Sequence, residues 1–229
     1  MSVIVHCEDL RKTYGENELQ VHAVNIDHLS IDKGEFISLS GPSGSGKTTL
    51  LNLIGGLDTA SSGKITVDNR RVDLMNKAEL ADMRLHHIGF VFQAYNLIPV
   101  LSAYENIEFI MQLQGIAANE RRERADIILN EVGLAGMGNR RPAQMSGGQQ
   151  QRVAVARAIV SKPSMVLADE PTANLDSHAS DELLDLMQQL NREHNTTFII
   201  ATHDQQVIDF TQRRIHMHDG KIDRDETQN

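Results

Sequence analysis

A glycine-rich loop carrying a lysine and a threonine offers the clearest chemistry in the sequence. The segment GPSGSGKT, residues 41–48, matches the pattern G-x-x-x-x-G-K-[ST] of a phosphate-binding loop. Backbone N–H groups of such a loop surround an anion, the lysine reaches the β- and γ-phosphates of a nucleotide, and the threonine hydroxyl binds Mg²⁺. A strand-like run before the loop and a helix-like run after it disfavour the alternative, a glycine-rich surface turn. We expect these residues to contact the nucleotide: Gly41, Ser43, Gly44, Ser45, Gly46, Lys47, Thr48 and Thr49.

Two carboxylates follow an apolar run later in the chain. In SMVLADE, residues 164–170, Asp169 and Glu170 stand at the end of a predicted buried strand. Ligands of open parallel sheets bind at the carboxyl ends of the strands, where the phosphate loop also lies. Asp169 is therefore a candidate ligand of Mg²⁺, directly or through water, and Glu170 a candidate general base for an attacking water. Taken alone, the pair could simply end a strand before Pro171.

Two other polar residues follow predicted buried strands. Gln93 comes after HIGFVF and His203 after TTFIIAT, so both are expected at the same edge of the sheet. Each alone would be an ordinary turn residue, but together beside a nucleotide loop they are candidate site residues.

The segment MSGGQQQR, residues 145–152, places a glycine pair where an apolar helix begins. Glycine in a helix is less favourable than alanine by about 1 kcal/mol. This loss of helix stability suggests that something must approach the bare backbone closely.

The elements that position these residues alternate between strand-like and helix-like patterns. Residues 35–40, 87–92, 164–169 and 196–202 are predicted buried strands, and helix signals follow most of them, which favours an α/β fold with a largely parallel sheet. Residues 3–10 and 21–31 alternate in polarity and predict an antiparallel side sheet. A terminal hairpin is expected at Asp219-Gly220, and residues 102–132 predict an inserted helical lobe.

Composition limits the classes of function. The 229 residues carry a net charge of −9, which disfavours nucleic-acid binding. The chain has no signal-peptide pattern and no apolar run near the ~20 residues that span a bilayer. The single cysteine, Cys7, excludes an internal disulfide and fits a reducing compartment. The pairs His86-His87 and His216-x-His218 lack accompanying ligands at metal-site spacing, so we predict no metal there.

These motifs, in this order, resemble the nucleotide-binding subunit of an ATP-binding cassette (ABC) transporter. The resemblance rests on GPSGSGKT, FVFQ, MSGGQ, MVLADE, NLD at 174–176 and ATHD. It implies a phosphate-loop NTPase (RecA-like) core in a single domain, 1–229. Residues 1–93 and 160–229 would form the core with its β subdomain, and residues 94–159 the helical subdomain.

The resemblance also accounts for the glycine pair. In this family two copies face each other head to tail, and each ATP lies between the phosphate loop of one and the SGGQ segment of the other. Ser146, Gly147, Gly148 and Gln149 would then close over the γ-phosphate held by the partner's Lys47.

Further roles are implied position by position. Tyr14 matches the aromatic residue that stacks on adenine, although it could be a turn tyrosine before Gly15. His203 matches the γ-phosphate contact, and Gln93 matches the residue that senses Mg²⁺ beside the surface facing the membrane partner. Asp176 matches a residue that contacts the opposite subunit, but it could equally cap the following helix. The implied catalytic residues are Glu170, His203, Lys47 and Gln93; the implied metal ligands are Thr48, Gln93 and Asp169; the implied cofactors are ATP and Mg²⁺.

One branch of the family is especially similar, that of the MacB and LolD ATPases, through NLIGGLDTASSGKI and FVFQAYNLIPVLSAYENI. It implies a homodimer that drives a permease with a large extracytoplasmic domain, for export or lipoprotein release. The ATPase would be a separate chain, or alternatively a domain excised from a fused permease; as a separate chain it would be soluble when isolated and held by the permease at the cytoplasmic face of the inner membrane. Alternatives are the ATPase of a cell-division complex, that of a solute importer, and a soluble non-transport ABC ATPase.

Overall fold

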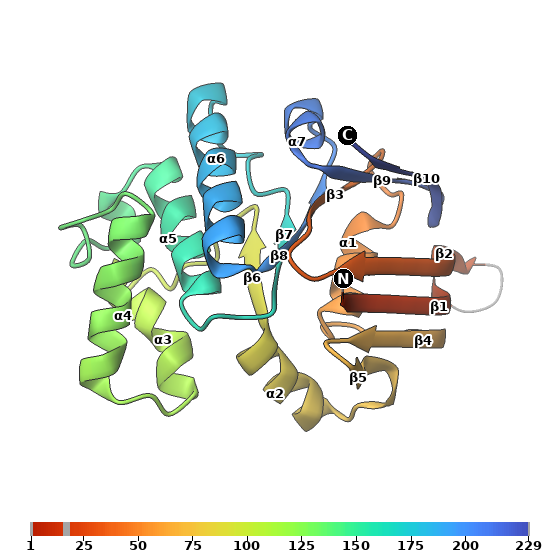
Figure 1. Ribbon diagram of the computed structural model, residues 1–229, viewed down its shortest axis with the longest axis horizontal. Coiled ribbons are helices and arrows are strands. Elements are labelled where there is room, and N and C mark those ends of the chain that lie inside the picture. The colour runs from red at the N-terminus through yellow and green to blue at the C-terminus, as the bar shows by residue number, and fades with distance from the viewer. Residues whose placement is uncertain (1, 16–18, 229) are drawn as a thin grey trace.

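The structure contains two β-sheets, one antiparallel and one mostly parallel (Figure 1). The computed structural model describes residues 2–15 and 19–228. The first sheet is antiparallel throughout, in the order β2-β1-β4-β5. Its strands are β1 (Val3–Tyr14), β2 (Val21–Asp32), β4 (Ser62–Val67) and β5 (Arg70–Arg71). The predicted antiparallel side sheet is thus confirmed, with two strands more than the sequence indicated.

The second sheet has the order β10-β9-β3-β8-β7-β6. Its strands are β3 (Phe36–Ser40), β6 (Ile88–Phe92), β7 (Met165–Asp169), β8 (Thr197–Thr202), β9 (Arg213–His218) and β10 (Lys221–Thr227). All neighbours pair in parallel except β9 and β10, which form the predicted terminal hairpin. Asp219 and Gly220 at its turn both have positive φ, 47° and 76°, as a two-residue type I′ turn requires. The α/β fold class is confirmed.

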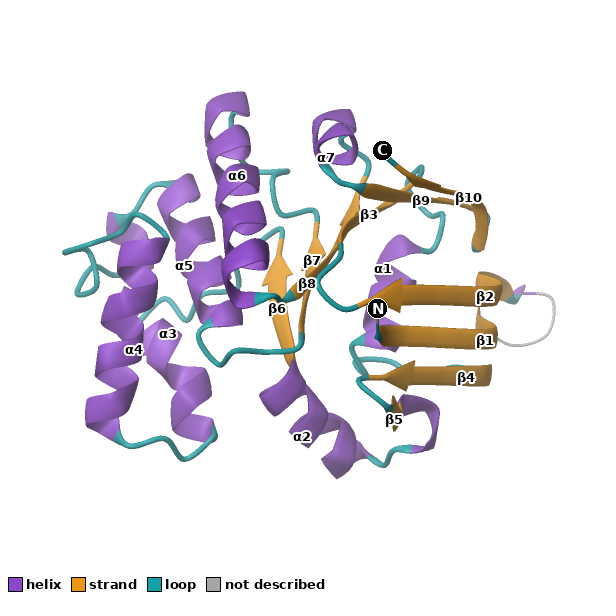
Figure 2. Cartoon of the chain, in the orientation of Figure 1, coloured by secondary structure: helices purple, strands orange, loops and turns teal. Residues whose placement is uncertain are grey.

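Helices fall into two groups (Figure 2). The first group is α1 (Lys47–Ile54), which contacts strands of both sheets, together with α2 (Lys77–His87), α6 (Ser177–His194) and α7 (Gln205–Phe210). The helical lobe, on the left in Figures 1 and 2, consists of α3 (Ala103–Leu113), α4 (Ala118–Glu131) and α5 (Gly147–Ile159). Short 3₁₀ turns, η2 (Val72–Leu74) and η3 (Pro142–Gln144), precede α2 and α5.

The helical lobe expected at residues 102–132 is confirmed, and this stretch forms the two helices α3 and α4. Ser102 begins α3 with a capping box to Glu105, and the chain reverses near Gly115, whose φ is +76°. The reversal lets α3 and α4 lie side by side. Ala125, Ile128 and Leu129 of α4 are buried, as the helical spacing predicts.

The core lies on both faces of the second sheet. Side chains alternate along each strand, so Phe198 and Ile200 of β8 pack with α5 and α6, whereas Ile199 and Ala201 pack with α1 and the antiparallel sheet. A sheet buried on both faces needs apolar residues at every position, which explains the uninterrupted apolar runs in the sequence. This rigid sheet holds the polar residues at its carboxyl edge.

Candidate active site

A cavity of about 800 Å³ opens at the carboxyl edge of the second sheet. It brings together polar residues from the loops after β3, β6, β7 and β8. Those predicted from the sequence are Ser43, Gly44, Ser45, Gly46, Lys47, Thr48, Thr49, Gln93, Asp169, Glu170 and His203. Side chains far apart in the sequence thus share one hollow because parallel strands end at one edge.

The backbone of the phosphate loop depends on its glycines. Gly41 and Gly46 have φ of 142° and 99°, and Gly46 stands at the N-cap of α1. A Cβ at Gly41 would lie 2.1 Å from the carbonyl oxygen of Met217, and one at Gly46 would lie 2.3 Å from that of Ala23. Only glycine fits at these two positions, so the fold itself fixes the loop around the N-terminus of α1.

Lys47 lies folded inside the loop. Its Nζ donates hydrogen bonds to the carbonyl oxygens of Gly41 at 2.7 Å and Pro42 at 3.0 Å. Burial lowers the pKa of Lys47, against the opposing attraction of Glu170 and Asp169. An ammonium group held by two carbonyl oxygens in a polar hollow is well placed to exchange them for phosphate oxygens.

Thr48 and Asp169 meet across the cavity. The Thr48 hydroxyl donates to Oδ1 of Asp169 at 3.1 Å. Burial, together with repulsion from Glu170, raises the pKa of Asp169, although Thr48 and Lys47 act in the opposite direction. A hydroxyl and a carboxylate side by side form an all-oxygen donor set, the kind that Mg²⁺ prefers.

Glu170 is held by two neighbours. Its Oε2 accepts from the Thr202 hydroxyl at 3.0 Å, and its Oε1 lies 2.6 Å from Nδ1 of His203. The backbone of Glu170 has a φ of 47°, in the left-handed region that few non-glycine residues adopt. The strain and the hydrogen bonds together fix the direction of this carboxylate. Thr202 was missed in the sequence, although its place as the last residue of the strand before His203 is a usable signal.

Tyr14 lies outside the residues that line this cavity, and 42% of its surface is exposed. Its hydroxyl donates to Oδ2 of Asp58 at 2.6 Å, while Nζ of Lys12 lies 4.7 Å from the ring centroid and 2.7 Å from Oδ1 of Asp58. Burial raises the pKa of Asp58, but the hydrogen bonds from Lys12 and Tyr14 outweigh it and leave the pKa below its usual value. Lys12 and Asp58 thus orient the Tyr14 ring, a role that sequence spacing did not reveal.

The glycine pair lines a different cavity, of about 460 Å³. Ser146 is the N-cap of α5: its Oγ accepts from the N–H of Gln149, and Gln149 Oε1 accepts from the N–H of Ser146 at 3.1 Å. The two cavities share no lining residue. A single chain therefore does not bring residues 146–149 into the hollow of the phosphate loop.

Packing within the chain does not explain the second glycine. A Cβ at Gly147 would lie 2.8 Å from the Tyr95 hydroxyl, but one at Gly148 would meet only the Cβ of Ala179, at an ordinary 3.6 Å. Asp176, whose role the sequence left open, is the N-cap of α6 and accepts from the N–H of Ala179 at 2.9 Å. Asp176 also lines the same cavity as the glycine pair. The helix that it caps, α6, ends at His194.

Comparison with known proteins fits this geometry. Residues 24–173 match the family model of the ABC transporter, so the chain belongs to the ABC transporter family and is an ABC ATPase. Over 96% of its length it is 45% identical to the ABC transporter ATP-binding protein YtrE of Bacillus subtilis, of which 94% is covered. It is 38% identical over 99% of its length to the lipoprotein-releasing system ATP-binding protein LolD of Pseudoalteromonas translucida, of which 97% is covered.

Two further similarities bear on architecture. The chain is 40% identical, over 96% of its length, to the macrolide export ATP-binding/permease protein MacB of Mannheimia succiniciproducens, but spans only 34% of that protein. The ATP-binding cassette MJ0796 of Methanocaldococcus jannaschii has been solved as a dimer in a post-hydrolysis state bound to ADP and Pi. That structure matches with a TM-score of 0.90 at 41% identity, covering 99% of both chains. Among the residues described here, no helix combines the length and apolarity needed to cross a bilayer.

Proposed function

We propose that the chain hydrolyses ATP as one half of a homodimer and that the cycle of dimer closure and opening drives a membrane permease. The observation that carries the proposal is the position of Glu170 in the same cavity as Lys47 and the Thr48–Asp169 pair. A fixed carboxylate beside a phosphate loop has the reach to orient or deprotonate an attacking water. Phosphoryl transfer needs this positioning together with charge stabilisation.

The site residues predicted from the sequence have these proposed roles. The phosphate-loop N–H groups and Lys47 bind the β- and γ-phosphates, and Thr48, Asp169 and Gln93 bind Mg²⁺ directly or through water. The ion would neutralise charge on the phosphates and on the leaving group. Glu170 orients the water, and His203 leaves Glu170 to contact the γ-phosphate. Outside the cavity, Tyr14 stacks on the adenine ring, held by Asp58 and Lys12.

A second copy of the chain completes the site. The free approach to Gly148 supports this, because no packing within the chain demands a bare backbone there. The N–H groups at the start of α5, together with Ser146, can bind an anion, but the phosphate loop of the same chain does not face them. In the proposed dimer this site receives the γ-phosphate bound to the partner, as the dimeric state of MJ0796 suggests.

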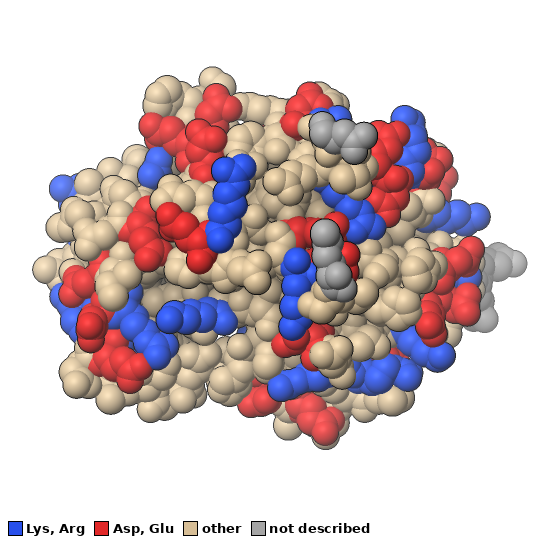
Figure 3. All heavy atoms as spheres, in the orientation of Figure 1, with Lys and Arg blue, Asp and Glu red and all other residues tan. Residues whose placement is uncertain are grey.

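A permease is the proposed second partner. An apolar cavity of about 430 Å³ lies between β6, α2 and α3, next to the segment from Gln93 to Ile110. Leu57 and Phe109 line this cavity and are exposed apolar side chains. Val100 and Leu113, close to Phe109 in the sequence, are exposed as well. We propose that an intracellular segment of the permease packs here, which would hold the ATPase at the cytoplasmic face of the membrane. On the face drawn in Figure 3, acidic and basic side chains intermingle instead of forming one basic area, which agrees with a protein rather than a nucleic-acid partner.

The similarity to LolD and MacB favours a permease with a large extracytoplasmic domain. The substrate and the direction of transport stay open, because a cell-division complex or a solute importer would use the same catalytic residues.

Two variants test the proposal. Lys47→Ala should weaken ATP binding and turnover. Phe109 does not line the cavity of the phosphate loop, so Phe109→Glu should leave the ATPase rate of the isolated chain unchanged but reduce co-purification with the permease from detergent-solubilised membranes. Normal turnover by Lys47→Ala would refute the site, and undiminished co-purification of Phe109→Glu would refute the docking surface.

A further inference from the structure

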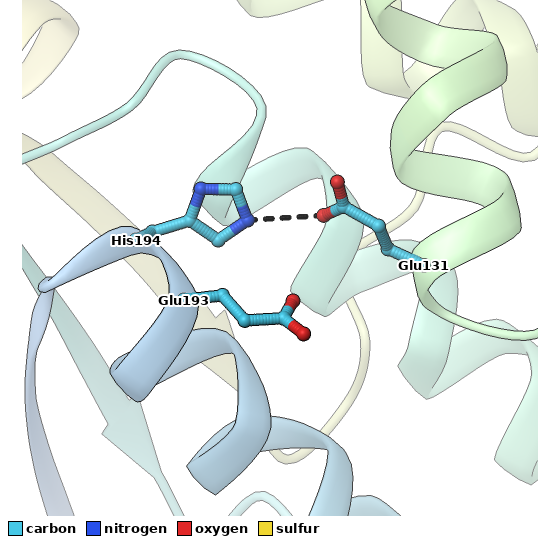
Figure 4. Close-up of side chains that lie close together, drawn as sticks. All are labelled: Glu131, Glu193 and His194. Atoms are coloured by element: carbon cyan, nitrogen blue, oxygen red, sulfur yellow. Dashed lines mark hydrogen bonds and ion pairs between the residues drawn. The ribbon is translucent and has the colours of Figure 1, made fainter.

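A second group of ligand-type side chains lies far from the phosphate loop in the sequence, between α4 and α6. Glu131 of α4 and Glu193 and His194 of α6 place one ligand atom each within 4.8 Å of one another (Figure 4). Nε2 of His194 lies 3.0 Å from Oε2 of Glu131. We propose that this cluster is a binding site for a divalent transition-metal ion of the Zn²⁺ type.

The donor set suits that class of ion. Imidazole nitrogen and carboxylate oxygen are both ligand types that Zn²⁺ accepts, whereas Mg²⁺ and Ca²⁺ prefer oxygen alone. The distances need only small side-chain rotations, because bonds of about 2.0–2.2 Å to one ion bring the donor atoms to within a few ångströms of each other.

Neighbouring contacts hold the ligands in place. The side chains of Glu131 and His194 are only 27% and 24% exposed, so their rotamers are restricted. Glu193 Oε1 accepts a hydrogen bond from Gln189 Nε2 at 2.9 Å, which orients the carboxylate and leaves its other oxygen available. Hydrogen bonds to the side chains that bind a metal orient these side chains and strengthen metal binding.

Helix ends add a favourable field. Glu131 is the last residue of α4 and His194 the last residue of α6, so two helix C-termini converge on the cluster. Each carries partial negative charge, which favours a cation there. Two cations oppose it: Arg124 and Lys162 line the adjoining cavity, which also includes His194. Arg124 is paired with Glu120, and Lys162 is therefore the principal unfavourable charge.

The position gives the site a structural consequence. α4 belongs to the helical lobe, whereas α6 packs on the second sheet, so an ion would cross-link the two. A metal that binds the folded protein alone raises its stability by mass action. At about 100 times its dissociation constant, the ion should raise the melting temperature by about 5–10 °C.

Zn²⁺ titration of the full chain, freed of metal with a chelator and without nucleotide, tests the proposal. His203 and Glu170 form another imidazole–carboxylate pair, so every protein is made in a His203→Ala background. The background protein should bind one Zn²⁺ that its His194→Ala derivative does not bind. Glu193→Gln should weaken the affinity by about 10-fold or more, and Lys162→Gln should strengthen it. His86→Ala, which removes the His86–Asp82 pair on α2, is the matched control and should bind as the background does.

Melting curves with and without Zn²⁺ provide the second readout. The metal-dependent rise should be present in the background and in His86→Ala, and absent in His194→Ala. If His194→Ala and the background bind the same number of Zn²⁺ ions with the same affinity, the cluster is an ordinary ion pair between two helices and the proposal is wrong. A folded His194→Ala protein, checked by its melting transition without metal, makes either outcome decisive.

Discussion

Oε1 of Glu170 lies 2.6 Å from Nδ1 of His203, so the candidate base and the candidate γ-phosphate contact are hydrogen-bonded to each other. The Glu170 side chain is 17% exposed, whereas that of His203 is 68% exposed and free to move. His203 therefore cannot keep this hydrogen bond to Glu170 and contact the γ-phosphate at the same time. If His203 turned to the γ-phosphate, as proposed, Glu170 would keep the hydrogen bond from Thr202 and have its other oxygen free for water.

Replacing Glu170 by glutamine should separate binding from turnover. The amide keeps the size of the side chain and one of its two acceptor oxygens but is a very weak base, so the hydrolysis rate should fall by about 10²–10⁴-fold. ATP binding should remain, and the protein should accumulate as an ATP-bound dimer in light scattering. Thr202→Val removes only an orienting hydrogen bond and should have a smaller effect. A Glu170→Gln enzyme that turns over at the normal rate would exclude Glu170 as the base.

Substituting Gly148 by alanine should stabilise the folded chain and, at the same time, lower its ATPase activity. The open space at its Cβ position and the helical propensity of alanine predict a gain of up to about 1 kcal/mol, or about 2–4 °C in melting temperature. The added methyl group would nevertheless crowd the proposed γ-phosphate of the partner, so ATPase activity should fall. Ser146→Arg should go further, abolishing turnover while each chain still binds ATP. Full activity in either variant, measured alongside a melting curve, would count against a site shared by two chains.

The Tyr14 contacts predict a graded loss of nucleotide affinity. Stacking of a base on an aromatic ring contributes about 1–3 kcal/mol, so Tyr14→Ala should weaken ATP binding by about 5- to 150-fold. Tyr14→Phe keeps the ring but loses the hydrogen bond to Asp58, so its loss should be smaller. Equilibrium titration with a fluorescent ATP analogue and with inorganic triphosphate distinguishes the cause. Only the adenine-containing ligand should respond, and an equal loss for triphosphate would contradict stacking.

Sequence patterns predicted most of the fold because the chemistry that they encode is local. Four buried strands agree with the structure to within about two residues, and the terminal hairpin turns at the predicted Asp219-Gly220, since apolar runs and an Asp-Gly turn are determined by nearby residues. The last strand of the hairpin extends further than predicted, to Thr227. The helical pattern of residues 102–132 did not show where the chain turns between α3 and α4, which is at Gly115. Strand β4 was missed although Ile65 and Val67 alternate with polar residues and are buried, because this alternation covers only the last four residues of the strand. Strand β5 was missed because it consists of two exposed arginines, which carry no strand pattern.

The candidate site was predictable where a motif defines it and not where only packing does. The phosphate loop, Asp169 and Glu170 occur in short patterns, and parallel strands bring them together. The hydrogen bonds of Asp58 and Thr202 join residues 44 and 32 positions apart, and no local pattern encodes such a distance. The cluster of Glu131 with His194 has the same origin, because it depends on how two helices pack.

Asp169 should make stability depend on pH in a direction opposite to Asp58. The native pKa of Asp169 is raised, so between the ordinary carboxyl value of about 3.9 and the native value the folded chain binds more protons than the unfolded chain. Stability contributed by this group is therefore lost as pH rises through that window. Without nucleotide, Asp169→Asn should raise the melting temperature at about pH 8, and the difference from wild type should vanish below about pH 3.9.

Asp58 provides the contrast, because its native pKa is lowered. The stability that it contributes is present above the ordinary carboxyl pKa and is lost as pH falls through the native value, so Asp58→Asn should lower the melting temperature near neutral pH. Melting curves of both variants over a pH series check the two signs. If Asp169→Asn were destabilised at about pH 8, burial would not disfavour the charged form of Asp169. The electrostatic argument for its proposed Mg²⁺ role would then fail.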